Sequence, residues 1–156
     1  ELPPFSHAID QGLEVLMTAH VVYPAWDAER PATFSPTILN DVLRNSLRFK
    51  GLIMSDDLEM QAVVDKLDSI PQLGTQAGVD VFLICHDLKK VKILQDAMIR
   101  DIENGSIPRS TINQSLARIF KVKQSIKVLQ NTSLNFENIL EENQHLAKEM
   151  RTFFKE

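Results

Sequence analysis

Two neighbouring carboxylates follow an apolar run in the middle of the chain. The segment Gly51–Met60 reads GLIMSDDLEM, and its apolar run ends abruptly at Ser55, Asp56 and Asp57. Removing an unpaired carboxylate from water is costly, so such residues gather at functional sites. We expect Asp56 to be the functional one, because it directly follows the strand and stands too early to cap the next helix. Asp57 also fits a helix N-cap or loop residue.

Two further apolar runs end in ionisable side chains. His20 follows the run Leu13–Ala19, and His86 and Asp87 follow the run Val79–Cys85. Ligands of α/β folds bind at the carboxyl ends of parallel strands, so the three exits should converge. Each histidine has a structural alternative, His20 as a satisfied half-buried ring and His86 as a partner of local backbone groups. The remaining carboxylates follow helical faces and are not expected to do chemistry.

The three apolar runs predict buried parallel strands over 13–19, 51–54 and 79–85. Their hydrophobicity is nearly continuous, which is typical of strands covered on both faces. The runs start roughly 30–40 residues apart, a spacing that suits consecutive βα units. Pattern alone leaves two architectures open, a doubly wound sheet and a (β/α)8 barrel, because a complete barrel takes about 250 residues.

Capping residues predict where the helices begin and end. Ser35 with Pro36 starts a helix that carries apolar residues to Leu47, and Asp87 starts a longer helix that stops at Asn104-Gly105. Gly78 should close a helix over 70–77. Further helices are predicted over 60–67, 110–128 and 136–154, and around His7 near the start.

Composition excludes several functional classes. The 156 residues suffice for one core, and a net charge of −4 without a basic, aromatic-interleaved cluster argues against a nucleic-acid partner. No apolar run reaches the length of about 20 residues that spans a bilayer, and no signal peptide is apparent, so no membrane partner is expected. The single cysteine, Cys85, ends an apolar run and is expected to be a buried, inert thiol rather than a reactive one.

Motifs for cofactors and for other catalytic chemistries are missing. The sequence contains no Gly-rich phosphate loop, no zinc-spaced Cys/His set and no nucleophile elbow, so neither a cofactor nor a metal is expected. One alternative makes Asp56, Asp57 and Glu59 a divalent-metal pocket for phosphoryl chemistry, as in response-regulator receivers. The loop Val21–Thr33 holds the only Tyr and the only Trp, and either stacks on a sugar or packs beneath a barrel rim.

Several motifs in consistent order resemble family 3 glycoside hydrolases, and most closely the bacterial β-N-acetylhexosaminidases of cell-wall recycling. They cover Glu1 to about Val128 and comprise Ala19-His20-Val21 with Tyr23-Pro24, Pro31-Ala32-Thr33 with Ser35, Leu47-Arg48-Phe49-Lys50-Gly51, Ser55-Asp56-Asp57-Leu58-Glu59-Met60, Ala77-Gly78-Val79-Asp80, Cys85-His86-Asp87 and Gly105-Ser106-Ile107.

The resemblance implies that the chain is the C-terminal three βα units of a (β/α)8 TIM barrel plus trailing helices. Residues 1–128 would be the partial barrel and 129–156 a C-terminal linker and helix. Asp56 matches the nucleophile of a retaining mechanism, which forms a covalent glycosyl-enzyme. His20, Asp57 and Met60 would bind substrate or support the site. The implied partner is an N-acetylglucosamine-containing glycan, and the implied location is the bacterial cytoplasm.

The chain also departs from the family pattern. The family's general acid/base is a histidine in a Lys-His-Phe-x-Gly-His-Gly loop, which this sequence lacks, and the segment Glu1–Phe5 corresponds to residues just after that loop. General acid–base catalysis is typically worth about 10²–10⁴-fold in rate, so the isolated chain should be practically inactive. Open strand edges should drive pairing with the missing barrel half or self-association. The alternative is a non-catalytic sugar-binding or assembly module.

Overall fold

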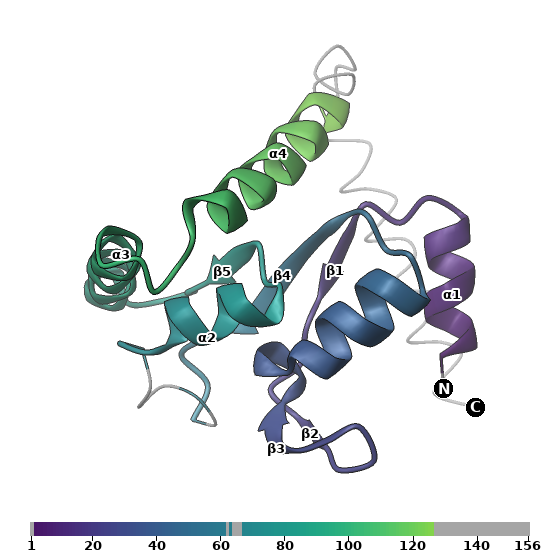
Figure 1. Ribbon diagram of the computed structural model, residues 1–156, viewed down its shortest axis with the longest axis horizontal. Coiled ribbons are helices and arrows are strands. Elements are labelled where there is room, and N and C mark those ends of the chain that lie inside the picture. Colours follow the sequence, from purple (N-terminus) through teal and green to yellow (C-terminus); the bar gives the residue numbers. More distant parts are fainter. Residues whose placement is uncertain (1, 62, 64–66, 127–156) are drawn as a thin grey trace, which may run out of the picture. The chain divides into compact units, whose positions relative to one another are not determined.

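A parallel three-stranded sheet forms the centre of the computed structural model, which describes residues 2–61, 63 and 67–126 (Figure 1). The strands are β1 (Val15–Met17), β4 (Leu52–Asp57) and β5 (Val81–Leu83), with β4 between the other two. Both pairings are parallel. The predicted α/β class with a parallel sheet is therefore confirmed.

The strand boundaries differ from those predicted. β1 and β5 are shorter than the apolar runs that contain them, whereas β4 continues beyond Met54 through Asp57. Asp56 is therefore part of the strand rather than the first residue after it. The expected burial on both faces holds for the central strand, where Ile53 is fully buried, but not for the edge strand β1, where Met17 is 57% exposed.

The helices with clear capping residues are found where the sequence predicts them. The helix α3 (Leu88–Glu103) begins after Asp87, whose side chain accepts a hydrogen bond from the Lys89 N–H at 2.8 Å. The helix α2 (Ile70–Ala77) ends at Gly78, which has a φ of +109°. A left-handed residue at this position is the usual helix stop and favours glycine. Two further helices are α1 (Pro3–Asp10) near the start of the chain and α4 (Arg109–Ile126) at the end of the described residues.

A third predicted helix forms with an unusual hydrogen-bonding pattern. Residues Thr37–Ser46 form a π-helix, and the Ser35 hydroxyl accepts a hydrogen bond from the Ile38 N–H at 3.2 Å. Ile38, Leu39 and Leu43 are buried in one core cluster with Ile53 of β4, as the apolar stripe predicts.

Other predicted helices are absent or undescribed. The described residues of 60–67 form turns and bends rather than a helix. The predicted helix over 136–154 and the end of the one over 110–128 lie outside the described residues. The chain divides into compact units at Gln124, and the second unit lies almost wholly outside them, so the division at 128/129 stays a prediction. No described helix is long and apolar enough to cross a membrane.

The segment interpreted as a loop over 21–33 contains an antiparallel hairpin. Its strands are β2 (Val22–Tyr23) and β3 (Asp27–Pro31). The Asp27 carboxylate accepts hydrogen bonds from the Glu29 and Arg30 N–H groups, both at 3.0 Å. A short 3₁₀ turn, Ala32–Phe34, then carries the chain into the core.

One buried carboxylate joins elements at the opposite end of the sheet from Asp56. Asp80, just before β5, accepts hydrogen bonds from Arg44 at 2.7 Å, Arg118 at 2.9 Å and Ser115 at 2.7 Å, and from the Ile53 N–H at 3.0 Å. Its side chain is 1% exposed. The expectation that the remaining carboxylates follow helical faces is wrong here, because Asp80 needs partners from three other elements to compensate its burial.

Candidate active site

The end of β4 is irregular, and this irregularity presents the two aspartates. Met54 pairs with Val81 and Asp57 with Leu83, so β4 uses one more residue than β5 over this stretch. The buried Ser55 hydroxyl accepts a hydrogen bond from the Leu83 N–H at 2.9 Å. Bulges of this kind bend a strand and re-aim its side chains, often beside active sites.

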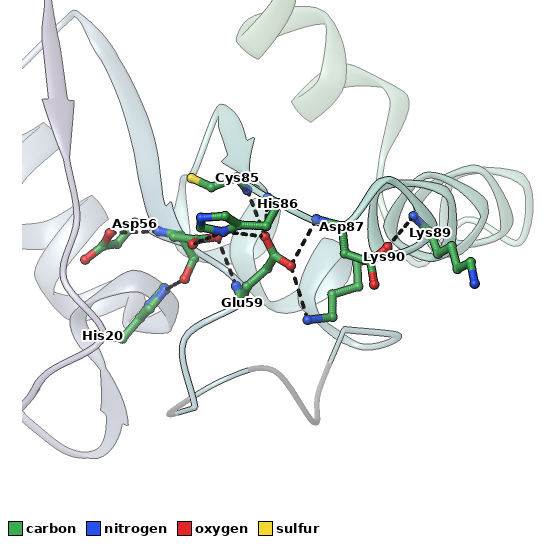
Figure 2. A network of polar contacts seen from close by, with 9 residues as sticks. His20, Asp56, Glu59, Cys85, His86, Asp87, Lys89 and Lys90 are labelled. Carbon is green, nitrogen blue, oxygen red and sulfur yellow. Dashed lines mark hydrogen bonds and ion pairs between the residues drawn. The ribbon is translucent and has the colours of Figure 1, made fainter.

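Asp56 lies at the edge of the polar network at the strand exits, with its carboxylate directed away from Glu59 and His86 (Figure 2). It is partly buried, and its Oδ1 accepts a hydrogen bond from the Asp57 N–H at 2.7 Å. Among the described residues Oδ2 has no hydrogen-bond donor. One oxygen is thus held by the backbone, and the other is available to a further partner.

His20 links the exit of β1 to the exit of β4. Its Nε2 lies 3.1 Å from the Asp57 carbonyl oxygen, and its Nδ1 lies 2.8 Å from the Thr33 hydroxyl. A carbonyl can only accept, so Nε2 carries a proton, and in the neutral ring Nδ1 accepts from Thr33. The Thr33 hydroxyl is also 2.8 Å from that of Thr18, and both threonines are buried.

His20 contacts a backbone carbonyl and a threonine hydroxyl, and no carboxylate among the described residues, and its ring stacks on Phe34 with centroids 6.2 Å apart. This arrangement suits a residue that supports the site. Thr33, which provides the ring's other hydrogen bond, appeared in the sequence only as part of a motif. The hairpin separates Thr33 from His20 in the sequence, so no local pattern indicates that the two side chains make contact.

Asp57 and Met60 stabilise the turn that leaves β4. The Asp57 carboxylate accepts the Glu59 N–H at 3.1 Å, which is the local pattern of an aspartate in a turn. The Asp57 carbonyl accepts the Met60 N–H at 3.2 Å. Asp57 is thus the last residue of β4, and its carboxylate makes a turn contact rather than capping a helix, whereas Met60 is 46% exposed.

Glu59 makes more contacts at this site than the sequence indicates. Its side chain is 9% exposed, and its carboxylate accepts the N–H groups of Cys85 at 3.0 Å, His86 at 2.5 Å and Asp87 at 3.2 Å (Figure 2). The Lys90 ammonium donates to it at 3.2 Å. All these donors come from the β5 exit and the start of α3, so only the convergence of strand ends could have indicated them.

The surroundings of Glu59 favour its charged form. Desolvation alone would raise the pKa of the carboxyl, but the hydrogen bonds from the His86 N–H and from Lys90 outweigh it and leave the pKa below its ordinary value of 4.5. Glu59 is therefore ionised at neutral pH.

His86 and Cys85 differ from their predicted surroundings. The His86 side chain is 80% exposed, and its Nδ1 lies 3.2 Å from Glu59 and 3.7 Å from Asp57, so the ring faces carboxylates rather than local backbone. Cys85 is exposed, and the expectation of a buried thiol is wrong because β5 ends two residues earlier. Desolvation, then the Asp57 carboxylate, raises the pKa of the thiol, which keeps it protonated at neutral pH.

One group of described residues has the composition of a metal site. Ligand atoms of Asp57, Glu59 and His86 lie within 4.8 Å of one another. Asp56, which the metal-pocket alternative required, is not part of this group. Both Glu59 oxygens already accept hydrogen bonds, and the Lys90 ammonium supplies the positive charge. As it stands, the group is an ion-pair cluster.

The hairpin aromatics lie at the mouth of an apolar hollow. Tyr23 and Trp26 are 43% and 42% exposed, and their ring centroids are 6.5 Å apart. Together with Phe5, Met17 and other residues they line a cavity of about 330 Å³. Half-exposed rings of this kind fit both sugar stacking and rim packing.

Comparisons with known proteins point to one family. The family model described as the glycosyl hydrolase family 3 N-terminal domain matches residues 1–122. The chain is 47% identical over 89 residues to a β-hexosaminidase of Nitrosomonas eutropha, covering 56% of this chain and 25% of that protein. It is 37% identical over 111 residues to a β-hexosaminidase of Methylobacillus flagellatus, covering 70% of this chain and 32% of that protein.

A solved structure agrees with these relatives. The family 3 β-N-acetylglucosaminidase from a Paenibacillus species superposes with a TM-score of 0.80 at 31% identity, over 86% of this chain and 26% of that one. The chain thus spans between a quarter and a third of the length of these proteins.

Proposed function

Because this chain belongs to glycosyl hydrolase family 3, we propose that it is the nucleophile-bearing part of a retaining β-N-acetylhexosaminidase, with Asp56 as the nucleophile. The observation that carries the proposal is the Asp56 carboxylate at the end of β4, with one oxygen held by the Asp57 N–H and the other without a donor among the described residues. The names of the relatives, a β-hexosaminidase and a β-N-acetylglucosaminidase, support N-acetylglucosamine-containing glycans as substrates. We extend this proposal to the glycans of peptidoglycan recycling.

In this mechanism the free Asp56 oxygen attacks the anomeric carbon, and the bond to the leaving oxygen breaks. The leaving oxygen takes a proton from a general acid. Water then gives a proton to the same acid/base group and attacks the anomeric carbon of the glycosyl-enzyme. The bond to Asp56 breaks, which releases the sugar in its original β configuration and returns the carboxylate. The residues of this chain position that carboxylate: Asp57 through its N–H, and His20 through the Asp57 carbonyl.

We further propose that the chain supplies the last three βα units of a (β/α)8 barrel, in which β1, β4 and β5 bring their exits together. The general acid/base would come from the part of the barrel that this sequence does not contain. The isolated chain should therefore lack measurable hydrolysis and should require that part for activity.

The test uses the natural polypeptide, or this chain supplied with the missing barrel portion, and p-nitrophenyl N-acetyl-β-glucosaminide. Asp56→Asn should lower kcat on the order of 10⁴-fold or more, because the neutral amide cannot form the glycosyl-enzyme. Asp41→Asn, at an exposed position on the helix Thr37–Ser46, is the matched control and should leave the rate unchanged. A 5-fluoro glycosyl fluoride should label Asp56, as read by peptide mass spectrometry. Full activity of Asp56→Asn would overturn the assignment.

The exposed Tyr23 and Trp26 favour a second candidate, a sugar-binding module without catalysis. Titration of the isolated chain with N-acetylglucosamine distinguishes the two. Saturable binding that Trp26→Ala abolishes would support the module, whereas no binding by the lone chain supports the enzyme fragment.

A further inference from the structure

We propose that Glu59 is a positioning residue that anchors the exit of β4, and with it Asp56, to the first turn of α3. The juxtaposition that carries this inference is a nearly buried carboxylate, three residues after Asp56, surrounded by N–H groups of the β5 exit. The catalytic consequence rests on the proposed function of Asp56, whereas the anchor itself does not.

The Glu59 carboxylate satisfies backbone groups that α3 cannot satisfy. The first N–H groups of a helix have no partner within it, and the residues just before the helix add further free donors. The Asp87 side chain accepts the Lys89 N–H, and the Asp87 carbonyl accepts the N–H groups of Lys90 and Val91. Glu59 accepts those of Cys85, His86 and Asp87, and it adds a negative charge where the helix dipole is positive.

A continuous set of contacts connects this anchor to Asp56. The Glu59 N–H donates to the Asp57 carboxylate, and the Asp57 N–H donates to the Asp56 carboxylate. The β4–β5 pairing is irregular at this point, and the Leu58 N–H to Leu83 carbonyl bond at 2.9 Å is the next backbone link between the two exits. Releasing Glu59 would therefore loosen the peptide that orients Asp56.

The chemistry of the site requires a carboxylate rather than a group of the same size. Both Glu59 oxygens face donors, with His86 on one side and Lys90 on the other. Glutamine would turn an NH₂ group toward one of these donors and would remove the charge that pairs with Lys90. A residue that only fills space would tolerate Glu59→Gln, and an anchoring carboxylate would not.

The test measures amide hydrogen exchange by NMR on the 156-residue chain. Glu59→Gln should increase exchange at Cys85, His86 and Asp87 by about tenfold or more, since hydrogen bonds to charged groups are lost, and should shift the Asp57 amide resonance. Glu29→Gln makes the same change at an exposed position on β3 and should alter none of these signals. Unchanged exchange at 85–87, or an unmoved Asp57 amide, would overturn the proposal.

A milder variant covers the case in which Glu59→Gln fails to fold. Lys90→Met removes one donor and leaves the three backbone contacts, so the same amides should respond in the same direction but by less. Unchanged amide exchange in Lys90→Met would also overturn the proposal.

In the natural polypeptide, Glu59→Gln should lower kcat while KM changes little, because Asp56 acts in the transition state. If Asp56→Asn kept full activity, the assignment of the nucleophile would fail, and the anchor would be judged by the exchange data alone.

Discussion

Thr33 connects the two sides of the site through a single hydroxyl group. It is fully buried and contacts both the Thr18 hydroxyl and His20 Nδ1 at 2.8 Å. Thr33→Val keeps the shape of the side chain but removes the hydrogen-bond partner of both Thr18 and His20. The free energy of unfolding should therefore fall by about 1–3 kcal/mol. Urea denaturation measures this change. Thr37→Val at an exposed position is the control, and a loss at Thr33 no larger than at Thr37 would contradict the hydrogen-bond chain.

The lowered pKa of Glu59 predicts how the stability of the chain depends on pH. A carboxyl whose folded-state pKa lies below its ordinary value of 4.5 contributes stability that is complete above that value and is lost as the pH falls through the lowered pKa. The groups that face it are Asp57 from β4, His86 from the β5 exit and Lys90 from α3.

The unfolding free energy of the wild type should therefore fall more between about pH 6 and pH 3 than that of Glu59→Gln, because the variant has no carboxylate to protonate. Chemical denaturation across this range measures the difference. Parallel pH profiles for the two proteins would show that Glu59 contributes no pH-dependent stability.

The residues that the sequence indicated share a local signal, and those it missed do not. Asp56, Asp57 and His20 each follow an apolar run, so their place at a strand exit could be predicted. Glu59 and Asp80 also lie near apolar runs, but the groups that bind their carboxylates belong to other elements of the chain. A buried carboxylate is identified by the groups that donate hydrogen bonds to it. For Glu59 and Asp80 these groups lie far away in the sequence, so local patterns do not indicate them.

At the scale of elements, one residue takes up a conformation that its side chain disfavours. Arg48 follows the helix Thr37–Ser46 with a φ of +56°, in the left-handed region that favours glycine after a helix. Arg48→Gly should raise the free energy of unfolding by roughly 0.5–1 kcal/mol, because the relief of strain exceeds the added flexibility of the unfolded chain.

Arg48→Ala is the matched control, since it removes the same charge but keeps the Cβ atom. Urea denaturation should find no comparable gain for the alanine variant. Equal stabilisation by glycine and alanine would assign the effect to the charge, because Arg48 shares a hollow with Lys50, Arg118 and Lys121.

The ends of elements bounded by capping residues could be predicted, whereas the ends of the paired strands and the hairpin could not. Asp87 and Gly78 mark helix ends through their own backbone and side-chain chemistry, and α2 and α3 follow them. The hairpin β2–β3 and the extension of β4 through Asp57 depend on a neighbouring strand. The register and the irregularities of pairing determine where a strand ends. The polar residues Ser55 and Asp56 suggest an end at Met54, although the strand continues past them.

At the scale of the whole molecule, the sheet has two strands that pair on one side only. Among the described residues, β1 and β5 each contact β4 and no other strand. Unpaired strand edges are templates for association, and natural proteins blunt them with charged residues, especially lysine. The edge strand β1 instead exposes Met17, which borders the apolar hollow that Phe5 and Trp26 also line.

We expect the isolated 156-residue chain to self-associate through this edge, and Met17→Lys to shift it toward the monomer. Sedimentation velocity at several protein concentrations measures the change. Phe120→Lys replaces a residue that is 60% exposed and belongs to α4 rather than to the edge strand β1, and should leave the distribution as it is. If both variants dissociated the chain equally, general hydrophobicity would explain the association. If only Met17→Lys did so, the edge of β1 is the surface that pairs, and a segment that completed the sheet there should compete with self-association.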